Sequence, residues 1–294
     1  MIHNKGGEVV GKILAYLLFL VFSILCVAPI LLLISVSLSD NGEILRNGYS
    51  FLPQGFNFSA YEYLLKDISK IAAAYKITII VTVCGTICSM ICTVFLAYVI
   101  SRKNFKYKSF IAFLIFFTML FHAGMFPSYY WITNGLNLKN NILALILPGL
   151  VSAWNVLLMK SFFLSLPDEI TEAASIDGCS HFGILFRIVL PLSKAAMATV
   201  GLFTLLRYFN DWQSSMLYMT DSSKISVQYF LYKTMNNVAE AQANASAMTS
   251  STEVFPQEPV RMAIAVITIV PIIVVFPFLQ KYFVKGITLG SVKG

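Results

Sequence analysis

Long runs of apolar residues with almost no charge restrict most strongly how this chain can fold. Hydrophobic residues make up 57% of the 294 residues and charged residues only 12%, whereas a soluble globular chain carries about 25% charged residues. A helix rises about 1.5 Å per residue, so a run of about 18 or more apolar residues crosses the hydrocarbon core of a bilayer. The sequence therefore predicts an all-α, polytopic membrane protein.

Six transmembrane spans are predicted, at residues 13–38, 77–100, 109–126, 141–160, 195–213 and 262–280. Three prolines lie inside them, Pro148, Pro271 and Pro277, and a proline in a membrane helix commonly marks a kink that neighbouring helices accommodate. The first run is longer than the apolar core of a cleaved signal peptide, which is about 7–15 residues. We therefore expect an uncleaved first span and one transmembrane domain over residues 1–294.

Basic residues in the loops predict the orientation. Residues 101–108 carry four positive charges and no acid, and such loops stay in the cytoplasm. With six spans, both termini and residues 161–194 then lie inside, and residues 39–76, 127–140 and 214–261 lie outside. The net charge of +7 follows from this bias, and no basic stripe interleaved with stacking aromatics indicates a nucleic-acid partner.

A repeat of cysteines and a polar outer segment are the next features of the sequence. Cys84, Cys88 and Cys92 repeat every four residues and share a helix face. No histidine is nearby, so we interpret them as small packing residues and expect no metal site. The outer segment Asn236–Thr252 is rich in Ala, Asn, Gln, Ser and Thr, which is typical of a flexible link or of a loop that contacts something outside.

A polar segment between the fourth and fifth spans contains the candidate functional site. Ser165 is expected to cap a short helix that has a proline and two acids in its first turn. The run Ile170–Asp177 suits that helix, and Gly178 is a natural stop. A second short helix is expected near His181–Leu190, ending by Pro191. The result is a helix–glycine–helix element in the cytoplasm.

The composition of this element favours a protein partner. Ala173 and Ala174 are small enough to let another surface approach closely, and Glu172 and Asp177 add charge. Helices that lie on anionic membranes are usually rich in Lys and Arg, whereas acids outnumber bases here. Contact with a protein is therefore favoured over an amphipathic hairpin on the membrane surface.

The spacing of this element resembles the EAA loop of ABC-importer permeases. Glu172-Ala173-Ala174 is followed after three residues by Gly178 and after nine more by Ile188-x-Leu190-Pro191. Its surroundings resemble the carbohydrate-permease branch, namely the maltose-type second subunit and its complex-sugar relatives. The segments that carry this wider resemblance are Ser165–Glu169, Leu190–Ser193, Phe209–Trp212, Lys281–Gly286 and Gly290–Gly294. Cys179 replaces the usual alanine and Ala195 a frequent proline, and nearly the whole chain is covered.

The resemblance implies a type I ABC-importer permease fold in a bacterial cytoplasmic membrane. It implies a second homologous permease subunit, two ATP-binding subunits and an extracellular solute-binding lipoprotein as partners, with a carbohydrate such as an oligosaccharide as substrate. The sequence has no phosphate-binding loop, so we expect no cofactor and no catalysis in this chain. ATP and Mg²⁺ belong to the partner ATPase. The residues implied to contact that ATPase are Glu172, Ala173, Ala174, Asp177, Gly178, Ile188, Leu190 and Pro191.

A sugar path needs aromatic faces, amides, carboxylates or arginine. Candidates are Tyr129, Tyr130, Trp131, Asn155, Arg207, Tyr208, Asn210, Asp211 and Trp212. Arg207 and Asp211 are four residues apart and are predicted to share a helix face and pair. A belt of Tyr and Trp at the membrane interface explains the same aromatics and is favoured. For Asn155, in mid-span, a hydrogen bond to a neighbouring helix is favoured over a position that faces a polar cavity.

A secondary transporter, an enzyme and a scaffold protein each fit the sequence less well. An ion-coupled secondary transporter usually keeps ionisable residues in mid-membrane, and the predicted spans have almost none. An enzyme needs a cluster of reactive groups, whereas His3, His122 and His181 are scattered. A scaffold does not explain the EAA spacing. A permease for another class of solute stays open, because specificity in such systems rests largely with the binding protein.

Overall fold

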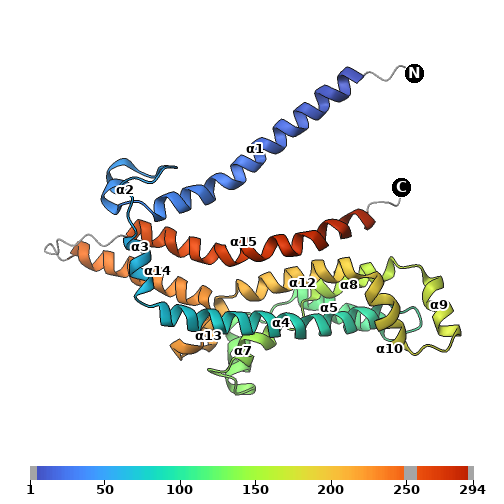
Figure 1. Cartoon of the computed structure of the whole chain (residues 1–294). Coiled ribbons are helices and arrows are strands. Elements are labelled where there is room, and N and C mark those ends of the chain that lie inside the picture. Colours follow the sequence, from blue (N-terminus) through green and yellow to red (C-terminus); the bar gives the residue numbers. More distant parts are fainter. Residues whose placement is uncertain (1–4, 248–256, 291–294) are drawn as a thin grey trace. The chain divides into compact units, whose positions relative to one another are not determined.

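The computed structural model describes residues 5–247 and 257–290, and these residues are helical and contain no strand (Figure 1). This confirms the predicted all-α class. Contacts divide the chain into two compact units. Unit 1 is built from Met1–Ile68 and Lys233–Pro271, and unit 2 from Ser69–Tyr232 and Ile272–Gly294. A single permease domain over residues 1–294 stays a prediction.

Unit 1 begins with the long helix α1 (Lys5–Ser37), followed by α2 (Asn41–Asn47) and α3 (Ser59–Leu65). It also takes most of α14 (Val227–Ala247) and the first part of α15 (Gln257–Gly290). Large apolar side chains are exposed all round α1 from Ile13 to Leu25. A helix that is apolar on every side belongs in a membrane or a protein core, so α1 suits a lipid-facing span.

Unit 2 contains nearly all of α4 (Ile68–Ser101), the end of α15 and the shorter elements between them. These are α5 (Lys108–Leu120), α6 (Met125–Tyr130), the π-helix η1 (Trp131–Gly135), α7 (Leu143–Ile146), the 3-10 helix η2 (Leu147–Gly149), α8 (Ala153–Leu164), α9 (Asp168–Ile176), α10 (His181–Ile184), the π-helix η3 (Leu185–Val189), α11 (Leu190–Leu192), α12 (Lys194–Phe209), α13 (Gln213–Tyr218) and the 3-10 helix η4 (Ser222–Lys224).

Within the part of the chain that the structure describes, three helices are long and apolar enough to cross a membrane: Gly11–Ser37, Ile68–Ser101 and Gln257–Val274. Three helix pairs pass the same test only when taken together, because each is bent at a short break. The bends are 115° between α5 and α6–η1, 49° between α7–η2 and α8, and 84° between α10–α11 and α12. Counting each pair as one span gives six.

The third predicted span is not one helix. α5 ends at Leu120, Phe121 is extended, and Gly124 has a φ of +87°. A positive φ cannot continue a right-handed helix, so the chain turns before α6. The prediction of a continuous helix over residues 109–126 is therefore wrong after Leu120.

Helices α4, α5, α8 and α12 share one buried cluster, which includes Val94, Ile115, Met159 and Val200. Asn155 of α8 donates from Nδ2 to the Thr204 hydroxyl of α12 at 3.0 Å, with both side chains buried. This confirms the interhelical bond predicted for Asn155. Because lipid is as apolar as leucine, such bonds and close packing hold membrane helices together.

The prediction that Cys84, Cys88 and Cys92 are packing residues is wrong for contacts within this chain. Cys84 and Cys88 are exposed and Cys92 is half-buried, because the opposite face of α4, with Ser89 and Thr93, carries the internal contacts. The cysteine face is therefore directed out of unit 2.

The segment after α12 is more ordered than predicted. α13, η4 and α14 occupy most of residues 213–247, so a flexible link is wrong as far as Ala247. Residues 248–252 lie outside the described part of the chain.

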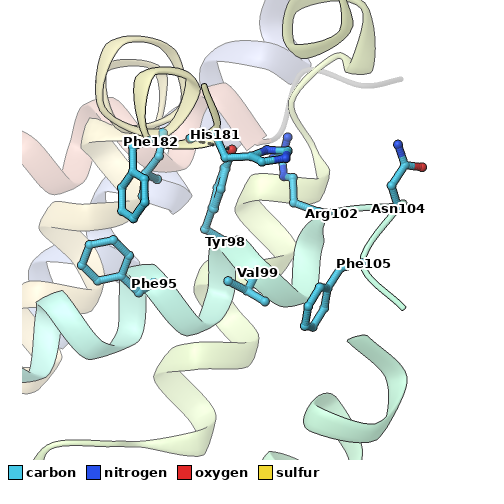
Figure 2. A pocket seen from close by; sticks show the side chains of 9 residues that line it. Phe95, Tyr98, Val99, Arg102, Asn104, Phe105, His181 and Phe182 are labelled. Carbon is cyan, nitrogen blue, oxygen red and sulfur yellow. Dashed lines mark hydrogen bonds between the residues drawn. The ribbon is translucent and has the colours of Figure 1, made fainter. Parts of the chain in front are cut away.

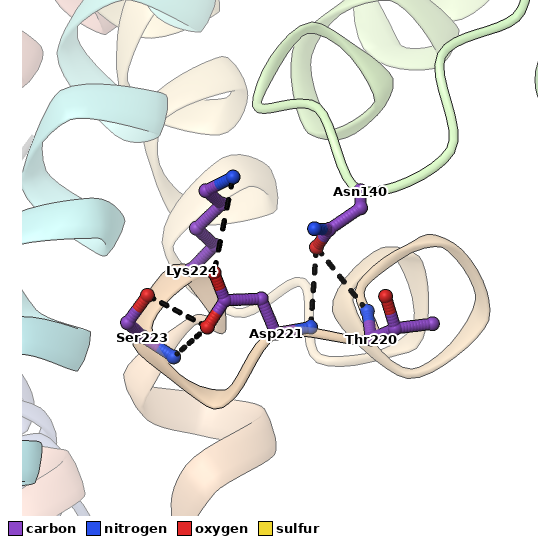
Figure 3. A network of polar contacts seen from close by, with 5 residues as sticks. All are labelled: Asn140, Thr220, Asp221, Ser223 and Lys224. Atoms are coloured by element: carbon purple, nitrogen blue, oxygen red, sulfur yellow. Dashed lines mark hydrogen bonds and ion pairs between the residues drawn. The ribbon is translucent and has the colours of Figure 1, made fainter.

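A polar network fixes the turn before α14 (Figure 3). The side-chain oxygen of Asn140 accepts from the backbone N–H groups of Thr220 at 3.4 Å and Asp221 at 3.1 Å. Asp221 accepts from the backbone and hydroxyl of Ser223, at 2.9 and 2.7 Å, and lies 3.8 Å from the Lys224 ammonium. The bonds from Ser223, and then the charge of Lys224, lower the pKa of the Asp221 carboxyl.

Candidate coupling site

Helix α9 begins two residues later than predicted. Ser165 is the C-cap of α8, and its hydroxyl donates to the Phe162 carbonyl at 2.8 Å. Pro167 is in extended conformation (ψ 129°) and precedes α9, whose first turn carries Asp168 and Glu169. The prediction of Ser165 as an N-cap is therefore wrong, whereas the two acids lie at the positive end of the helix dipole as expected.

Gly178 ends α9 as predicted. Its φ is +79°, the left-handed conformation that glycine adopts with least strain. Its N–H donates to the Ser175 carbonyl at 3.2 Å, and the N–H of Cys179 donates to the Ala174 carbonyl at 3.0 Å. These two bonds form a Schellman motif, which satisfies carbonyls that the helix end leaves free.

The second helical segment is longer than predicted and changes geometry. Ser180 caps α10 by accepting from the Gly183 N–H at 3.2 Å. The chain continues through the π-helix η3 and α11 as far as Leu192, one residue past Pro191. Proline has no N–H to donate, and a π-turn commonly accompanies such a break. The chain then bends at Ser193 into α12.

The coupling segment, residues 168–192, packs directly into the helix bundle. Ala174, Ile184, Leu185 and Val189 belong to the same buried cluster as α4, α8 and α12. The Tyr98 hydroxyl of α4 also donates to the His181 carbonyl at 3.1 Å. The segment and the membrane helices therefore share one packed core, and packed interiors deform little.

The residues predicted to contact an ATPase fall into two groups. Glu172, Ala173, Asp177, Gly178 and Pro191 are exposed, whereas Ala174 is buried and Ile188 and Leu190 pack against the bundle. The expectation that Ala174 faces a partner is wrong, because its side chain lies on the inner face of α9.

Sequence reasoning missed one surface residue and one ion pair. Ile176 of α9 is 85% exposed. Its position as a large aliphatic residue within a polar segment was the feature of the sequence that could have indicated this. Lys103, in the loop after α4, lies 2.5 Å from the Asp168 carboxylate. The hydrogen bond and charge of Asp168, with smaller contributions from Glu172 and Glu169, raise the pKa of Lys103. The acidic face of α9 is thus tied to the basic loop.

Helices α7 and α13 lie away from α9 and α10 along α12 (Figure 1). Most candidate path residues belong to elements of that region, in α6 and η1 and from Arg207 to Trp212 at the end of α12 and just after it. Tyr208 is buried, and its hydroxyl donates to the Ile146 carbonyl at 2.9 Å. A Cβ added to Gly85 would lie 2.7 Å from its ring, and one added to Gly149 would lie 2.8 Å from its hydroxyl. Tyr208 is thus a packing residue wedged between two glycines.

The predicted pairing of Arg207 with Asp211 is wrong. Arg207 donates from Nη2 to the Gly149 carbonyl, and its guanidinium lies 5.0 Å from the centre of the Tyr208 ring. Asp211 accepts from the Ser214 N–H at 2.9 Å, at the start of α13. Because α12 ends at Phe209, the two side chains no longer share a helix face.

The other aromatic candidates divide between internal contacts and surface. Tyr129 stacks on Tyr218 with 6.2 Å between ring centroids, and Trp212 stacks on Tyr232 at 4.5 Å. Tyr130 and Trp131 are 58% and 63% exposed. Of the amide and charged candidates, Asn210 and Arg207 are exposed. The available surface at this end is therefore a mixture of aromatic, amide and cationic groups.

Up to six membrane spans, with a polar element packed on the helix bundle, define a multi-pass membrane protein. Residues 89–289 match the family of binding-protein-dependent transport system inner membrane components. The chain belongs to this family. It is a non-catalytic, multi-pass inner-membrane permease subunit of an ABC importer, which works with an ATPase and a solute-binding protein.

Two relatives from Bacillus subtilis are similar over nearly their full length. The polygalacturonan/rhamnogalacturonan transport system permease protein YtcP is 37% identical over 282 residues, which cover 96% of this chain and 97% of that protein. Protein LplC is 34% identical over 268 residues, covering 91% and 90%. Among solved structures, a chain of a bacterial ABC transporter involved in the import of the acidic polysaccharide alginate matches with a TM-score of 0.79 and 32% identity, covering 96% of this chain and 99% of that one.

Proposed function

We propose that this chain is one of two homologous permease subunits through which an oligosaccharide enters a bacterial cell by alternating access. The functions of its relatives support a carbohydrate, since they include polygalacturonan/rhamnogalacturonan and alginate transport. An external solute-binding lipoprotein delivers the sugar. Two partner ATPases bind ATP and Mg²⁺, and this chain supplies no cofactor site.

Helix α9 is the segment that docks on the ATPase. One observation carries this assignment: Ala174 packs into the bundle while Glu172, Ala173 and Ile176 of the same helix are exposed. An inner face joined to the membrane helices and an outer face with a small residue, an acid and a protruding aliphatic group suit a force-transmitting contact. Gly178 fixes where that surface ends.

The orientation follows from the basic loop at residues 101–108. The Lys103–Asp168 ion pair supports it, because it joins that loop to α9. Both termini then face the cytoplasm, and the outer mouth of the sugar path includes Arg207, Asn210 and Trp131, which are exposed.

Reconstitution of the complete transporter tests this function. Proteoliposomes with the binding protein and both ATPases should accumulate a labelled galacturonate oligomer when ATP is enclosed on the cytoplasmic side. An arabino-oligosaccharide and glycerol 3-phosphate serve as comparison substrates. Accumulation of glycerol 3-phosphate alone would contradict a carbohydrate permease.

Charge reversal and backbone disruption in α9 test the docking assignment. We expect Glu172→Lys and Gly178→Pro to leave the protein in the membrane but to abolish uptake coupled to ATP hydrolysis, because one reverses the docking charge and the other requires a negative φ. Glu62→Lys, a matched reversal at an exposed position of α3, should transport normally. Normal uptake in both α9 variants would overturn the assignment.

A further inference from the structure

A pocket of about 310 Å³ lies where the end of α4 meets α10 (Figure 2). Phe95 and Phe182 line its aromatic end, Arg102, Asn104 and Phe105 lie at the other end, and His181 lies between them. None of the residues predicted to contact the ATPase lines this pocket. An aromatic end and a second end that adds a cation and an amide suit an amphiphilic molecule.

Arg102 supplies the positive charge of the pocket. Its guanidinium carbon lies 4.5 Å from the centre of the Tyr98 ring, and its Nε is buried without a hydrogen-bond partner in the described part of the chain. The Tyr98 hydroxyl already donates to the His181 carbonyl. A buried donor left unpaired costs free energy, and a guanidinium matches the oxygens of a phosphate.

The aromatic end of the pocket continues onto an apolar surface. The ring centroid of Phe95 lies 6.2 Å from that of Phe182 and 6.3 Å from that of Phe186. Phe182 and Phe186 are 66% and 55% exposed. On α4 the same face continues through Ile91 and Ile87, which are 51% and 55% exposed and lie one and two helical turns away. Such a face suits acyl chains.

We propose that this pocket binds an anionic phospholipid, with its phosphate on Arg102 and an acyl chain along Phe95 and Phe182. Charge complementarity selects this occupant, because the loop at residues 101–108 carries four positive charges and no acid, and Asp168 of α9 engages Lys103 and not Arg102. Lipids of the negatively charged cytoplasmic leaflet are attracted to such basic clusters at helix ends. A peptide of the partner ATPase would match the charge but not the apolar surface that continues along α4.

The site goes beyond the proposed transport function and rests on it only for the leaflet that supplies the lipid. Arg102 directly follows the last residue of α4, and Lys103 beside it holds Asp168 of α9. A bound lipid therefore lies against the residues that fix the coupling segment to α4.

Native mass spectrometry of the purified transporter complex tests the proposal. The delipidated complex is incubated with phosphatidylglycerol and phosphatidylcholine of identical acyl chains, and bound lipid is counted as collision energy rises. The wild type should retain phosphatidylglycerol preferentially. Arg102→Gln should reduce that retention about tenfold, the effect of losing hydrogen bonds to a charged group.

Lys106→Gln is the matched control, because it removes the same charge from the same loop and does not line the pocket. It should retain phosphatidylglycerol as the wild type does. Phe182→Ala should shorten retention of both lipids, whereas Phe110→Ala, at an exposed aromatic position of α5, should not. Should Arg102→Gln fail to assemble, Arg102→Lys keeps the charge without the planar fork and should lose part of the preference.

Equal losses in Arg102→Gln and Lys106→Gln would show diffuse attraction and overturn the site. A photo-crosslinker at position 182 that reaches the ATPase instead of lipid would also overturn it. Co-purification of the ATPase and ATP-driven uptake are measured on the same samples. Normal uptake without lipid retention refutes the lipid site alone, whereas lipid retention without any coupled uptake refutes the transport function alone.

Discussion

Gly178 shows how one residue sets the geometry of the coupling segment. A Cβ at this position would meet nothing within 4 Å, so space is not the reason for a glycine. The reason is the φ of +79°, which permits the two Schellman bonds and turns the chain toward α10. Any L-residue placed there is strained by its own backbone.

Gly178→Ala is expected to destabilise the end of α9 by about 1 kcal/mol, the usual cost of a side chain in the left-handed region. Hydrogen exchange over residues 168–177 should become faster, and ATPase stimulation by the loaded binding protein should fall. Gly183→Ala is the control, because its Cβ would make an ordinary 3.5 Å contact with Ser180 Oγ. Equal exchange in both variants would refute the backbone argument.

Close packing at Gly85 gives a second residue-level prediction. Its added Cβ would lie 2.7–2.9 Å from the Tyr208 ring, and overpacking of this kind costs about 1–3 kcal/mol. Gly85→Ala should therefore lower the unfolding midpoint in a detergent titration, and the same substitution should cost less in a Tyr208→Ala background, where the ring is absent. Gly201→Ala, whose Cβ would lie 3.9 Å from Met90 Sδ, should have little effect. An unchanged midpoint for Gly85→Ala would contradict the packing.

Among whole elements, the contact between the basic loop and α9 decides how the coupling segment is held. Lys103 is well exposed, so the free energy of its ion pair is screened by water and small. The pair nevertheless selects one orientation of α9, because it engages Asp168 in the first turn.

Lys103→Ala is expected to increase hydrogen exchange in α9, whereas Lys106→Ala, in the same loop, should not.

The pKa of Lys103 is raised above its ordinary value of 10.5 by Asp168. A raised pKa means that the contribution of this group is fully present below pH 10.5 and is lost as pH rises through the higher folded value. After correction for the intrinsic pH dependence of exchange, the protection of α9 should therefore stay the same between pH 6 and pH 9, provided that the ionic strength is held constant. Faster exchange in Lys106→Ala than in Lys103→Ala would contradict the assignment.

The positions of the helices were predicted from the sequence more accurately than the points at which the chain bends or turns. Apolar runs indicated the helices, and glycine spacing indicated the end of α9. The turn at Gly124 and the 49° bend between η2 and α8, inside the predicted span 141–160, were missed, because hydropathy does not change where the backbone changes direction. The inward face of Ala174, the wedge of Tyr208 and the contact of Lys103 with Asp168 join residues far apart in sequence, and no local pattern encodes such contacts.

At the scale of unit 2, α4 joins the proposed coupling segment to the region of the candidate path residues. Tyr98 near its end bonds the coupling segment at His181, and Gly85 packs against Tyr208 beside the path candidates. Thirteen residues of helix separate these positions, about 20 Å at the usual rise. A rigid helix and its packed neighbours can therefore carry a displacement at α9 to the region around α7 and α13.

Thiol labelling from each side of the membrane tests the orientation on which this transmission depends. Cys179 is exposed next to Gly178, and we expect an impermeant maleimide to label it in inverted vesicles but not in intact protoplasts, with protection by the ATPase. In a cysteine-free background, Lys139→Cys, at an exposed position beside Asn140, should show the opposite pattern. Labelling of Cys179 from outside would reverse the topology and move the coupling segment away from ATP.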